Sequence, residues 1–433
     1  MKLSVIGCGY LGAVHAAAMA ELGHDVIGID VDPGKIEQLR AGRAPFFEPG
    51  LPEVLASANA SGRLRFSTDI ADAGEATVHF VAVGTPQSRD GNAADLRYVD
   101  AAIEALLPHL KAGDLVVGKS TVPVGTARRL ADRVAGAGSG ARLAWNPEFL
   151  REGYAVKDTI EPDRLVYGVD DDRDTAVLDE VYASAIASGT PRIVSNFPTA
   201  ELVKVAANAF LATKISFINA MAEIAEVTGA DVTRLADAVG HDARIGRRFL
   251  NAGVGFGGGC LPKDIRAFAA RAEELGRGES IAFLKEVDVI NLRRRQRVVE
   301  LAREALDGAV HGRKVAVLGV TFKPHSDDVR DSPALDVAVQ LKGLGADVVV
   351  TDPEGIDNAR MRHPQLLYSN VTEEALRHAD LVVLVTEWPE YLGLDPAHVK
   401  EIARASTIID GRNALDSAAW KAAGWRYVGM GRT

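Results

Sequence analysis

The segment that decides the fold is KLSVIGCGYLG, residues 2–12. Residues 2–6 form a short apolar run, typical of a buried strand, which leads directly into Gly7-Cys-Gly-Tyr-Leu-Gly12. Residues 13–22 then predict a helix, and residues 25–30 predict a second strand. The glycines therefore lie at a strand-to-helix turn, where exposed backbone N–H groups at the start of a helix can bind a pyrophosphate.

Asp30 ends the second predicted strand, at the position whose carboxylate accepts hydrogen bonds from a ribose 2′-hydroxyl. A carboxylate there repels a 2′-phosphate, so the pattern favours NAD over NADP. The three-glycine pattern alone is also compatible with a merely tight turn. Because strand, turn, helix, second strand and terminal acid all agree, we expect a dinucleotide site here.

Length and composition limit the class of protein. With 433 residues and 47% hydrophobic content, the chain is too long for one core and predicts two or three domains. A formal net charge of -10 argues against nucleic-acid and anionic-membrane partners. Two cysteines cannot form a disulfide framework, and a strand from residue 2 leaves no room for a signal peptide. We expect no apolar run long enough to span a bilayer, and therefore a cytoplasmic protein.

The first two thirds of the chain predict two regions. Apolar strands at residues 78–83 and 115–119 extend a parallel sheet, which gives an NAD-binding Rossmann domain over residues 1–197. Residues 198–227 predict one helix about 45 Å long, a length suited to bridging domains or forming a subunit interface. With the mostly helical stretch that follows, it gives a central helical domain over residues 198–295.

The order of strand, helix, strand and acid returns near the C-terminus. Residues 314–319, 334–344 and 347–352 repeat it, and further strands are expected at 381–385 and 407–410. The repeat lacks the three-glycine turn, so a second domain over residues 312–433 is expected to bind a different nucleotide. The predicted fold class is α/β, with two doubly wound Rossmann-like parallel-sheet domains joined by a long central helix and a helical dimerisation region.

Cys260 lies in GVGFGGGCLPKD, residues 253–264, where a thiol could do chemistry. Pro262 suits the first turn of a helix, which places the thiol near a helix N-terminus and Asp264 on the same face. Such a position generally lowers the pKa of a thiol and favours the nucleophilic thiolate. A lone cysteine is more often a small buried hydrophobe, and we assign Cys8 to that class. The dense glycines before Cys260 mark backbone held close to a ligand and favour the reactive interpretation.

Other polar residues occur at spacings suited to a reaction. Lys204 and Asn208 are one helical turn apart in an apolar stretch, so they predict either a solvated stripe or oxyanion donors facing an interdomain cleft. Glu148 follows the strand-like residues 142–145, where a general base and a surface carboxylate fit equally well. Thr121 also follows a strand and could hold water or a substrate hydroxyl, or cap a helix. The ten histidines and two cysteines show no ligand spacing, so no metal is expected.

Eight motifs in this order resemble the UDP-glucose/GDP-mannose dehydrogenase family along essentially the whole chain. They are Gly7-Cys-Gly-Tyr-Leu-Gly12, Phe47-Glu-Pro-Gly-Leu51, Gly84-Thr-Pro86, Ser120-Thr-Val-Pro-Val-Gly125, Asn146-Pro-Glu-Phe-Leu-Arg-Glu-Gly153, Lys204 with Asn208 and Lys214-Ile-Ser-Phe217, Gly255-Phe-Gly-Gly-Gly-Cys-Leu-Pro-Lys-Asp264, and Phe322-Lys323.

The resemblance implies a four-electron oxidation of the 6-hydroxyl of a nucleotide sugar, with UDP-glucose the expected substrate and two NAD+ used in succession. Cys260 would attack the aldehyde from the first oxidation, and the thiohemiacetal would be oxidised to a thioester that water hydrolyses. Lys204 and Asn208 would stabilise the oxyanions. Glu148 would be the base in hydrolysis, while Asp264 and Thr121 would position or activate water.

The resemblance also implies the residues that bind each ligand. The cofactor would be bound by Gly7, Gly9, Tyr10, Leu11, Gly12, Asp30, Lys35, Val83, Gly84, Thr85, Thr121, Glu152, Lys263 and Arg330. The nucleotide sugar would be bound by Glu148, Phe149, Leu150, Glu152, Lys204, Asn208, Phe249, Leu250, Gly253, Phe256, Gly257, Cys260, Phe322, Lys323 and Arg412. Arg244 would reach across a homodimer into the neighbouring substrate site, which would make the dimer catalytic.

Three alternatives stay open. A GDP-mannose or UDP-N-acetylmannosamine 6-dehydrogenase of the same family would share the catalytic residues. A two-electron hydroxyacid dehydrogenase would need neither Cys260 nor the C-terminal nucleotide domain. A non-catalytic nucleotide-sugar sensor would need no nucleophile, so the presence of Cys260, Lys204 and Asn208 argues against it.

Overall fold

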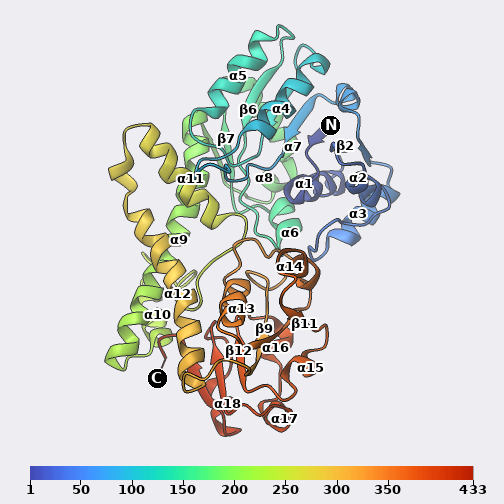
Figure 1. Ribbon diagram of the computed structural model, residues 1–433. Coiled ribbons are helices and arrows are strands. Elements are labelled where there is room, and N and C mark those ends of the chain that lie inside the picture. Colours follow the sequence, from blue (N-terminus) through green and yellow to red (C-terminus); the bar gives the residue numbers. More distant parts are fainter. Residues whose placement is uncertain (433) are drawn as a thin grey trace. The chain divides into compact units, whose positions relative to one another are not determined.

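The computed structural model describes residues 1–432, which form two compact units (Figure 1). Unit 1 comprises Met1–Ala207 and Ala267–Gly278, and unit 2 comprises Asn208–Arg266 and the residues from 279 onward. The boundary falls inside helices α9 (Phe197–Thr228) and α11 (Leu261–Glu274), so each of these continuous helices contributes residues to both units. This arrangement confirms the expectation that the long helix bridges two parts of the chain.

Unit 1 is built on an eight-stranded sheet with the order β3-β2-β1-β4-β5-β6-β7-β8. Its strands are β1 (Lys2–Ile6), β2 (Asp25–Ile29), β3 (Leu64–Ser67), β4 (Val78–Val81), β5 (Leu115–Gly118), β6 (Arg142–Trp145), β7 (Leu165–Gly168) and β8 (Arg192–Ser195). The sheet is parallel except where β6 and β7 pair antiparallel, so the expected parallel sheet is interrupted once. Chain order reverses between β1 and β4, and ligands of such sheets bind at the carboxyl ends of strands beside that point.

Helices cover both faces of this sheet. They are α1 (Tyr10–Glu21), α2 (Pro33–Arg40), α3 (Leu51–Ala60), η1 (Ile70–Glu75), α4 (Arg97–Leu106), η2 (Leu107–His109), α5 (Thr126–Gly136), α6 (Ala155–Ile160), α7 (Asp172–Val181) and α8 (Ala183–Ala187). Side chains alternate along each strand between two cores: Leu115 and Val117 pack into one, and Val116 into the other. Burial on both faces explains why these strands are continuous apolar runs.

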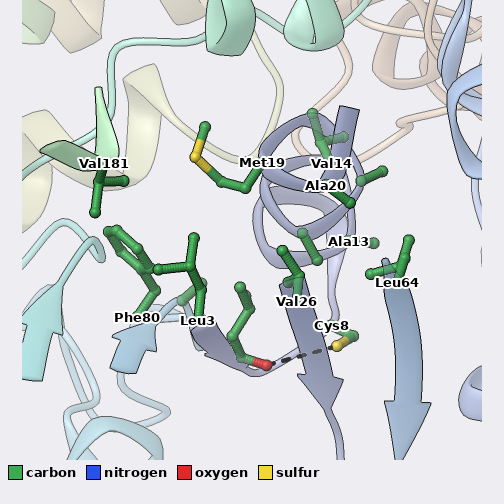
Figure 2. Packing of buried hydrophobic residues seen from close by; sticks show 14 of the residues in the cluster. Leu3, Cys8, Ala13, Val14, Met19, Ala20, Val26, Leu64, Phe80 and Val181 are labelled. Atoms are coloured by element: carbon green, nitrogen blue, oxygen red, sulfur yellow. Dashed lines mark hydrogen bonds between the residues drawn. The ribbon is translucent and has the colours of Figure 1, made fainter. Parts of the chain in front are cut away.

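Cys8 lies in the first of these cores. Figure 2 shows it among apolar side chains that include Val26 and Leu64. Its thiol donates to the Val5 carbonyl at 3.9 Å. Burial raises the pKa of the Cys8 thiol well above its ordinary value. This placement confirms that Cys8 is a small buried hydrophobe.

Unit 2 carries a second, wholly parallel sheet of six strands with the order β11-β10-β9-β12-β13-β14. The strands are β9 (Lys314–Leu318), β10 (Asp347–Thr351), β11 (Leu367–Tyr368), β12 (Leu381–Leu384), β13 (Thr407–Asp410) and β14 (Arg426–Gly429). The other helices of unit 2 are α10 (Val232–Gly240), η3 (Gly278–Ile281), α12 (Phe283–Ala305), α13 (Pro333–Gly343), α14 (Ile356–Arg362), α15 (Thr372–Leu376), α16 (Pro389–Leu392), α17 (Pro396–Ile402) and α18 (Ser417–Ala422). Two Rossmann-like sheets thus confirm the predicted α/β fold.

Asp352 follows β10 as Asp30 follows β2, but the protein itself satisfies its carboxylate. Oδ2 accepts from Val320 N at 2.7 Å, from Thr321 N at 3.1 Å and from the Trp388 indole at 3.1 Å, and Oδ1 accepts from Gly355 N at 2.8 Å. A carboxylate with so many internal donors has little capacity left for a ribose. The second sheet therefore lacks the turn glycines and also an available acid.

Helix α9 is by length and composition apolar enough to cross a membrane, which the sequence analysis did not expect. The window that meets this test is 44% buried inside the structure. Three polar side chains of α9 are also buried: Lys204, Asn208 and Asn219 are each less than 9% exposed. Buried polar side chains of this kind indicate a helix that packs within the protein.

Candidate active site

Two glycines of the Gly7–Gly12 turn, Gly7 and Gly12, leave no room for a larger residue. Gly7 has φ +89°, and a Cβ on Gly12 would lie 1.8 Å from the Gly7 carbonyl oxygen. The Asp30 carboxylate, directly after β2, accepts from Cys8 N at 2.8 Å and from Lys35 Nζ at 2.9 Å. The acid expected at the ribose thus lies against the turn expected at the pyrophosphate, as NAD binding requires.

Two loops beside this turn are tied to each other at the ends of β4 and β5. The Ser120 hydroxyl donates to the Val83 carbonyl at 2.7 Å, and the Thr85 hydroxyl donates to the Thr121 carbonyl at 2.8 Å. Helix α5 is preceded by Gly125, so Thr121 does not cap it. Thr121 therefore lies near the end of β5 without capping α5, and its expected role in holding water or a substrate hydroxyl stays a prediction.

Glu148 and Lys204 form an ion pair in unit 1, in which Lys204 is buried and Glu148 is partly buried. Lys204 Nζ donates to Glu148 Oε1 at 3.1 Å, and Leu150 N donates to Oε2 at 2.7 Å. Lys204 is 6% exposed and lies over the Phe149 ring, 5.6 Å from its centroid. Because Lys204 is buried, the interpretation of this residue as part of a solvated stripe is wrong. Its ammonium group lies beside the Glu148 carboxylate.

Lys119 is a buried cation near this pair that the sequence analysis did not single out. Its Nζ donates to Asn146 Oδ1 at 3.0 Å and to the Tyr182 hydroxyl at 3.2 Å, and the residue is 6% exposed. Burial lowers the pKa of Lys119 to about 8, with Lys204 adding to the decrease and Glu148 opposing it. The sequence feature that could have identified this buried cation is its position directly after the apolar strand LVVG.

Cys260 directly precedes the first residue of α11, as Pro262 predicted. The thiol is exposed, and the Cys260 carbonyl accepts from Asp264 N at 2.9 Å. Asp264 is 3% exposed and binds two donors: Asn208 Nδ2 at 2.7 Å and Lys263 Nζ at 2.5 Å. Unit 2 thus brings together an accessible thiol, an oriented amide and a buried carboxylate.

The glycine-rich segment before Cys260 is held by side chains of unit 2. Asn291, fully buried on α12, accepts from Phe256 N at 2.7 Å and donates to Phe256 O at 2.9 Å. A Cβ on Gly257 would lie 2.2 Å from the Asp331 carbonyl oxygen, and one on Gly259 would lie 2.3 Å from the Arg330 guanidinium carbon. The glycines stand out in the sequence, whereas Asn291 resembles any other polar residue of a helix.

Arg412 is held by the backbone near the same segment. Its guanidinium donates to the carbonyls of Gly255, Phe322 and Val385, each at 2.8–2.9 Å. The arginine expected to contact the nucleotide sugar therefore also braces the segment that carries the other expected contacts.

The remaining expected substrate residues of unit 2 differ in exposure. Arg244 is exposed and paired with Asp242 at 2.6 Å. Phe249 has φ +67° and is 37% exposed, whereas Leu250 is 2% exposed. Lys323 Nζ lies 5.3 Å from the Phe322 ring centroid. Within residues 1–432, three or more His, Cys, Asp or Glu side chains do not gather into a metal-binding group.

Three family models match successive parts of the chain. Residues 1–186 match the NAD binding domain of the UDP-glucose/GDP-mannose dehydrogenase family, residues 198–293 match its central domain, and residues 316–417 match its UDP binding domain. The chain belongs to this family. The residues that match the NAD binding domain include the Gly7–Gly12 turn and Asp30, and those that match the UDP binding domain include Asp352, whose carboxylate is satisfied internally.

Relatives within the UDP-glucose/GDP-mannose dehydrogenase family are similar along the full chain. A UDP-glucose 6-dehydrogenase of Rhizobium meliloti is 41% identical over 437 residues, which cover 100% of both proteins. A solved UDP-glucose dehydrogenase from Pyrobaculum islandicum is 42% identical with a TM-score of 0.91, covering 100% of this chain and 98% of that one. A UDP-D-ManNAc dehydrogenase from Pyrococcus horikoshii is 26% identical with a TM-score of 0.87, covering 100% and 99%.

Proposed function

We propose that this chain catalyses the NAD-dependent four-electron oxidation of UDP-glucose to UDP-glucuronate. The observation that carries the proposal is 41% identity to a UDP-glucose 6-dehydrogenase over the whole of both chains. Identity to the UDP-D-ManNAc dehydrogenase is much lower, at 26%, so UDP-glucose is favoured over the alternative substrates of the family.

The residues around Cys260 support a covalent route. In the proposed reaction, the Cys260 thiolate adds to C6 of the aldehyde and forms a thiohemiacetal, whose oxidation gives a thioester. Water then cleaves the C6–S bond, which releases the carboxylate and returns the thiol. The exposed thiol at the start of α11 is accessible for this addition, and Asp264 lies one helical turn away.

Two hydrogen-bond donors on α9 could stabilise the substrate oxygen that becomes negatively charged in this route. Lys204 and Asn208 carry N–H groups one helical turn apart on α9, where they bind the carboxylates of Glu148 and Asp264. These N–H groups would stabilise the oxyanion, since preorganised donors in a buried place are worth more than in water. Glu148 would take the proton from the hydrolytic water, and Thr121 would help to hold that water.

NAD+ supplies the hydride acceptor, one molecule for each of the two oxidations. Gly7, Gly9 and Gly12 would hold its pyrophosphate, while Asp30 and Lys35 would hold the adenosine ribose. Because Asp30 already lies against the turn, its carboxylate would repel the 2′-phosphate of NADP.

The stoichiometry of NADH tests this proposal. We expect two NADH for each UDP-glucose consumed, since both oxidations must occur before the acid is released. The measurement is NADH absorbance against UDP-glucuronate determined by mass spectrometry in the same sample. One NADH per sugar would instead indicate a simple alcohol dehydrogenase, and binding without turnover would indicate a sensor.

The same assay separates the substrates of the family. UDP-glucose, UDP-N-acetylmannosamine and GDP-mannose are compared at equal concentration, and we expect UDP-glucose to give the highest kcat/KM. A higher value for either of the others would reassign the substrate while leaving the reaction class intact.

We also infer three domains, 1–197, 198–295 and 312–433, a cytoplasmic location and a homodimer formed through the central helix. The support for the dimer is an apolar stripe on α9 with heptad spacing: Phe210, Phe217 and Ile224 are 67%, 49% and 56% exposed. Such a seam suits a second copy of the same helix. Large exposed apolar residues in a regular row are uncommon on monomers.

A charge in the middle of this stripe tests the dimer. Phe217→Lys is expected to reduce the molecular mass in solution from two chains to one, because it places ammonium groups into a buried apolar contact. Light scattering after size exclusion measures the mass. Phe283→Lys, also an exposed phenylalanine of unit 2 but on α12, is the matched control. An unchanged dimer in Phe217→Lys would contradict the assignment of this stripe.

A further inference from the structure

Glu48 lies where three hydrogen-bond donors of unit 1 converge. The residue is 2% exposed. Its Oε2 accepts from the Tyr10 hydroxyl and from Gly153 N at 2.6 Å, and its Oε1 accepts from Ala155 N at 2.6 Å. The Tyr10 hydroxyl in turn accepts from Gly153 N at 3.1 Å. One buried carboxylate therefore joins two segments that are distant in sequence.

The two segments carry residues expected at different ligands, apart from Glu152, which is expected at both. Tyr10 is the first residue of α1 and lies inside the dinucleotide turn, where its ring contacts Phe46 with 4.7 Å between centroids. Gly153 ends the segment 146–153, which carries Glu148 and the other expected sugar contacts that follow β6. Glu48 thus connects the turn for NAD to the segment for the sugar.

The protonation of Tyr10 fits this connection. Burial raises the pKa of Tyr10 well above its ordinary value, and the hydrogen bond to Glu48 raises it further. The phenol therefore stays a donor to the carboxylate at every pH at which the enzyme would work. A charge-assisted bond of this type is about twice as strong as a neutral one.

Capping of α6 alone does not explain the arrangement. A helix cap needs only a side-chain oxygen for backbone N–H groups, and Asp171 and Asp231 cap their helices in that way without a tyrosine. At Glu48 the same oxygen that binds Gly153 N also binds the hydroxyl from the dinucleotide turn. The geometry therefore links two segments as well as ending a helix.

We propose that Glu48 is a positioning residue that couples NAD binding to nucleotide-sugar binding, by fixing the segment 146–153 to the Tyr10 turn. The inference rests on the proposed function for the identity of the two ligands. When one ligand orders its own segment, the shared carboxylate orders the other, so the second ligand binds to a partly ordered site.

Glu48→Gln tests this coupling. A glutamine has one acceptor oxygen instead of two and no charge, so it loses either the bond from Ala155 N or the bonds from Tyr10 and Gly153, and in both orientations the charge-assisted link is weakened. We expect NADH to tighten UDP-glucose binding about tenfold in the wild-type protein and to have almost no effect in Glu48→Gln. Calorimetric titration of UDP-glucose, with and without saturating NADH, measures this factor independently of turnover.

Asp174→Asn is the matched control, because Asp174 is also a carboxylate of unit 1, 1% exposed, but binds Arg142 and neither segment. It should lower the melting temperature and keep the tenfold factor. Tyr10→Phe should lose the factor, and adding Glu48→Gln to it should change little more. If Glu48→Gln does not fold, Tyr10→Phe alone decides the result.

The outcomes separate the two proposals. An unchanged factor in Glu48→Gln or Tyr10→Phe, or an equal loss in Asp174→Asn, would overturn the role of Glu48 while UDP-glucose oxidation by the wild type stands. A wild-type protein that binds no UDP-glucose would overturn the proposed function and with it this inference.

Discussion

Cys260→Ser is expected to reduce UDP-glucuronate formation at least about a thousandfold, which corresponds to ~4 kcal/mol in the barrier. A serine hydroxyl is scarcely ionised at neutral pH, so it cannot replace the thiolate that retains the aldehyde. The fold should be unaffected, because Cys260 is exposed and serine is a favourable residue immediately before a helix. UDP-glucose affinity should stay near the wild-type value, as measured by titration calorimetry.

Cys8→Ser is the matched control for this variant. Cys8 is fully buried, so a serine there costs stability through a hydroxyl placed in an apolar core but leaves the reaction intact. Iodoacetamide provides an independent measurement: it should modify Cys260 in the wild type and in Cys8→Ser, and modify nothing in Cys260→Ser. Undiminished acid formation by Cys260→Ser would remove the thiol from the mechanism.

Local sequence patterns predicted the elements that carry the site. The turn after β1 lies at the predicted glycines, and α11 begins beside Pro262 as predicted. Helix α9 is about as long as the apolar run indicated. Such features depend on neighbouring residues, so a sequence shows them directly. The antiparallel pairing of β6 and β7 depends on where β7 returns to the sheet, and no local pattern records that.

Partners far apart in sequence could not be predicted. The bond between Glu148 and Lys204 spans 56 residues, and so does the bond between Asn208 and Asp264. The motifs indicated which residues take part, but the pairing of each donor with its carboxylate follows from the tertiary structure. Asn291 was not singled out, and Glu48 was quoted within a motif without a role, for a related reason: each binds backbone groups of a remote segment.

Lys119→Met is expected to stabilise the protein at pH 7 by about 2 kcal/mol. Folding lowers the pKa of Lys119 from 10.5 to about 8, and one pKa unit corresponds to about 1.4 kcal/mol, so burying the ammonium costs about 3 kcal/mol below pH 8. Methionine fills a similar volume without charge. The lost hydrogen bonds offset about 1 kcal/mol of the gain, since Asn146 Oδ1 still accepts from the Tyr182 hydroxyl at 2.7 Å.

The pH dependence gives this prediction its sign. Between pH 8 and 10.5 the unfolded state binds more protons at Lys119 than the folded state, so this residue makes the wild type more stable as pH rises. The advantage of Lys119→Met should therefore be full at pH 7 and should reverse near pH 10.5 to a deficit of up to about 1 kcal/mol, because only the lost hydrogen bonds remain there. Urea unfolding of both proteins, followed by amide protection in β5 and β6, measures the difference. Lys2→Met, an exposed lysine of the same unit, should show no such trend.

The same substitution also tests whether Lys119 contributes to the reaction. Its charge acts on Glu148 and Lys204, and its Nζ binds Asn146, two residues before Glu148. A buried cation that costs stability is expected where a reaction needs its field or its hydrogen bonds. We therefore expect Lys119→Met to be more stable and to have a lower kcat for UDP-glucose, with Lys2→Met unchanged in both. A variant that gains stability and keeps full kcat would show that the lysine serves neither Glu148 nor Lys204.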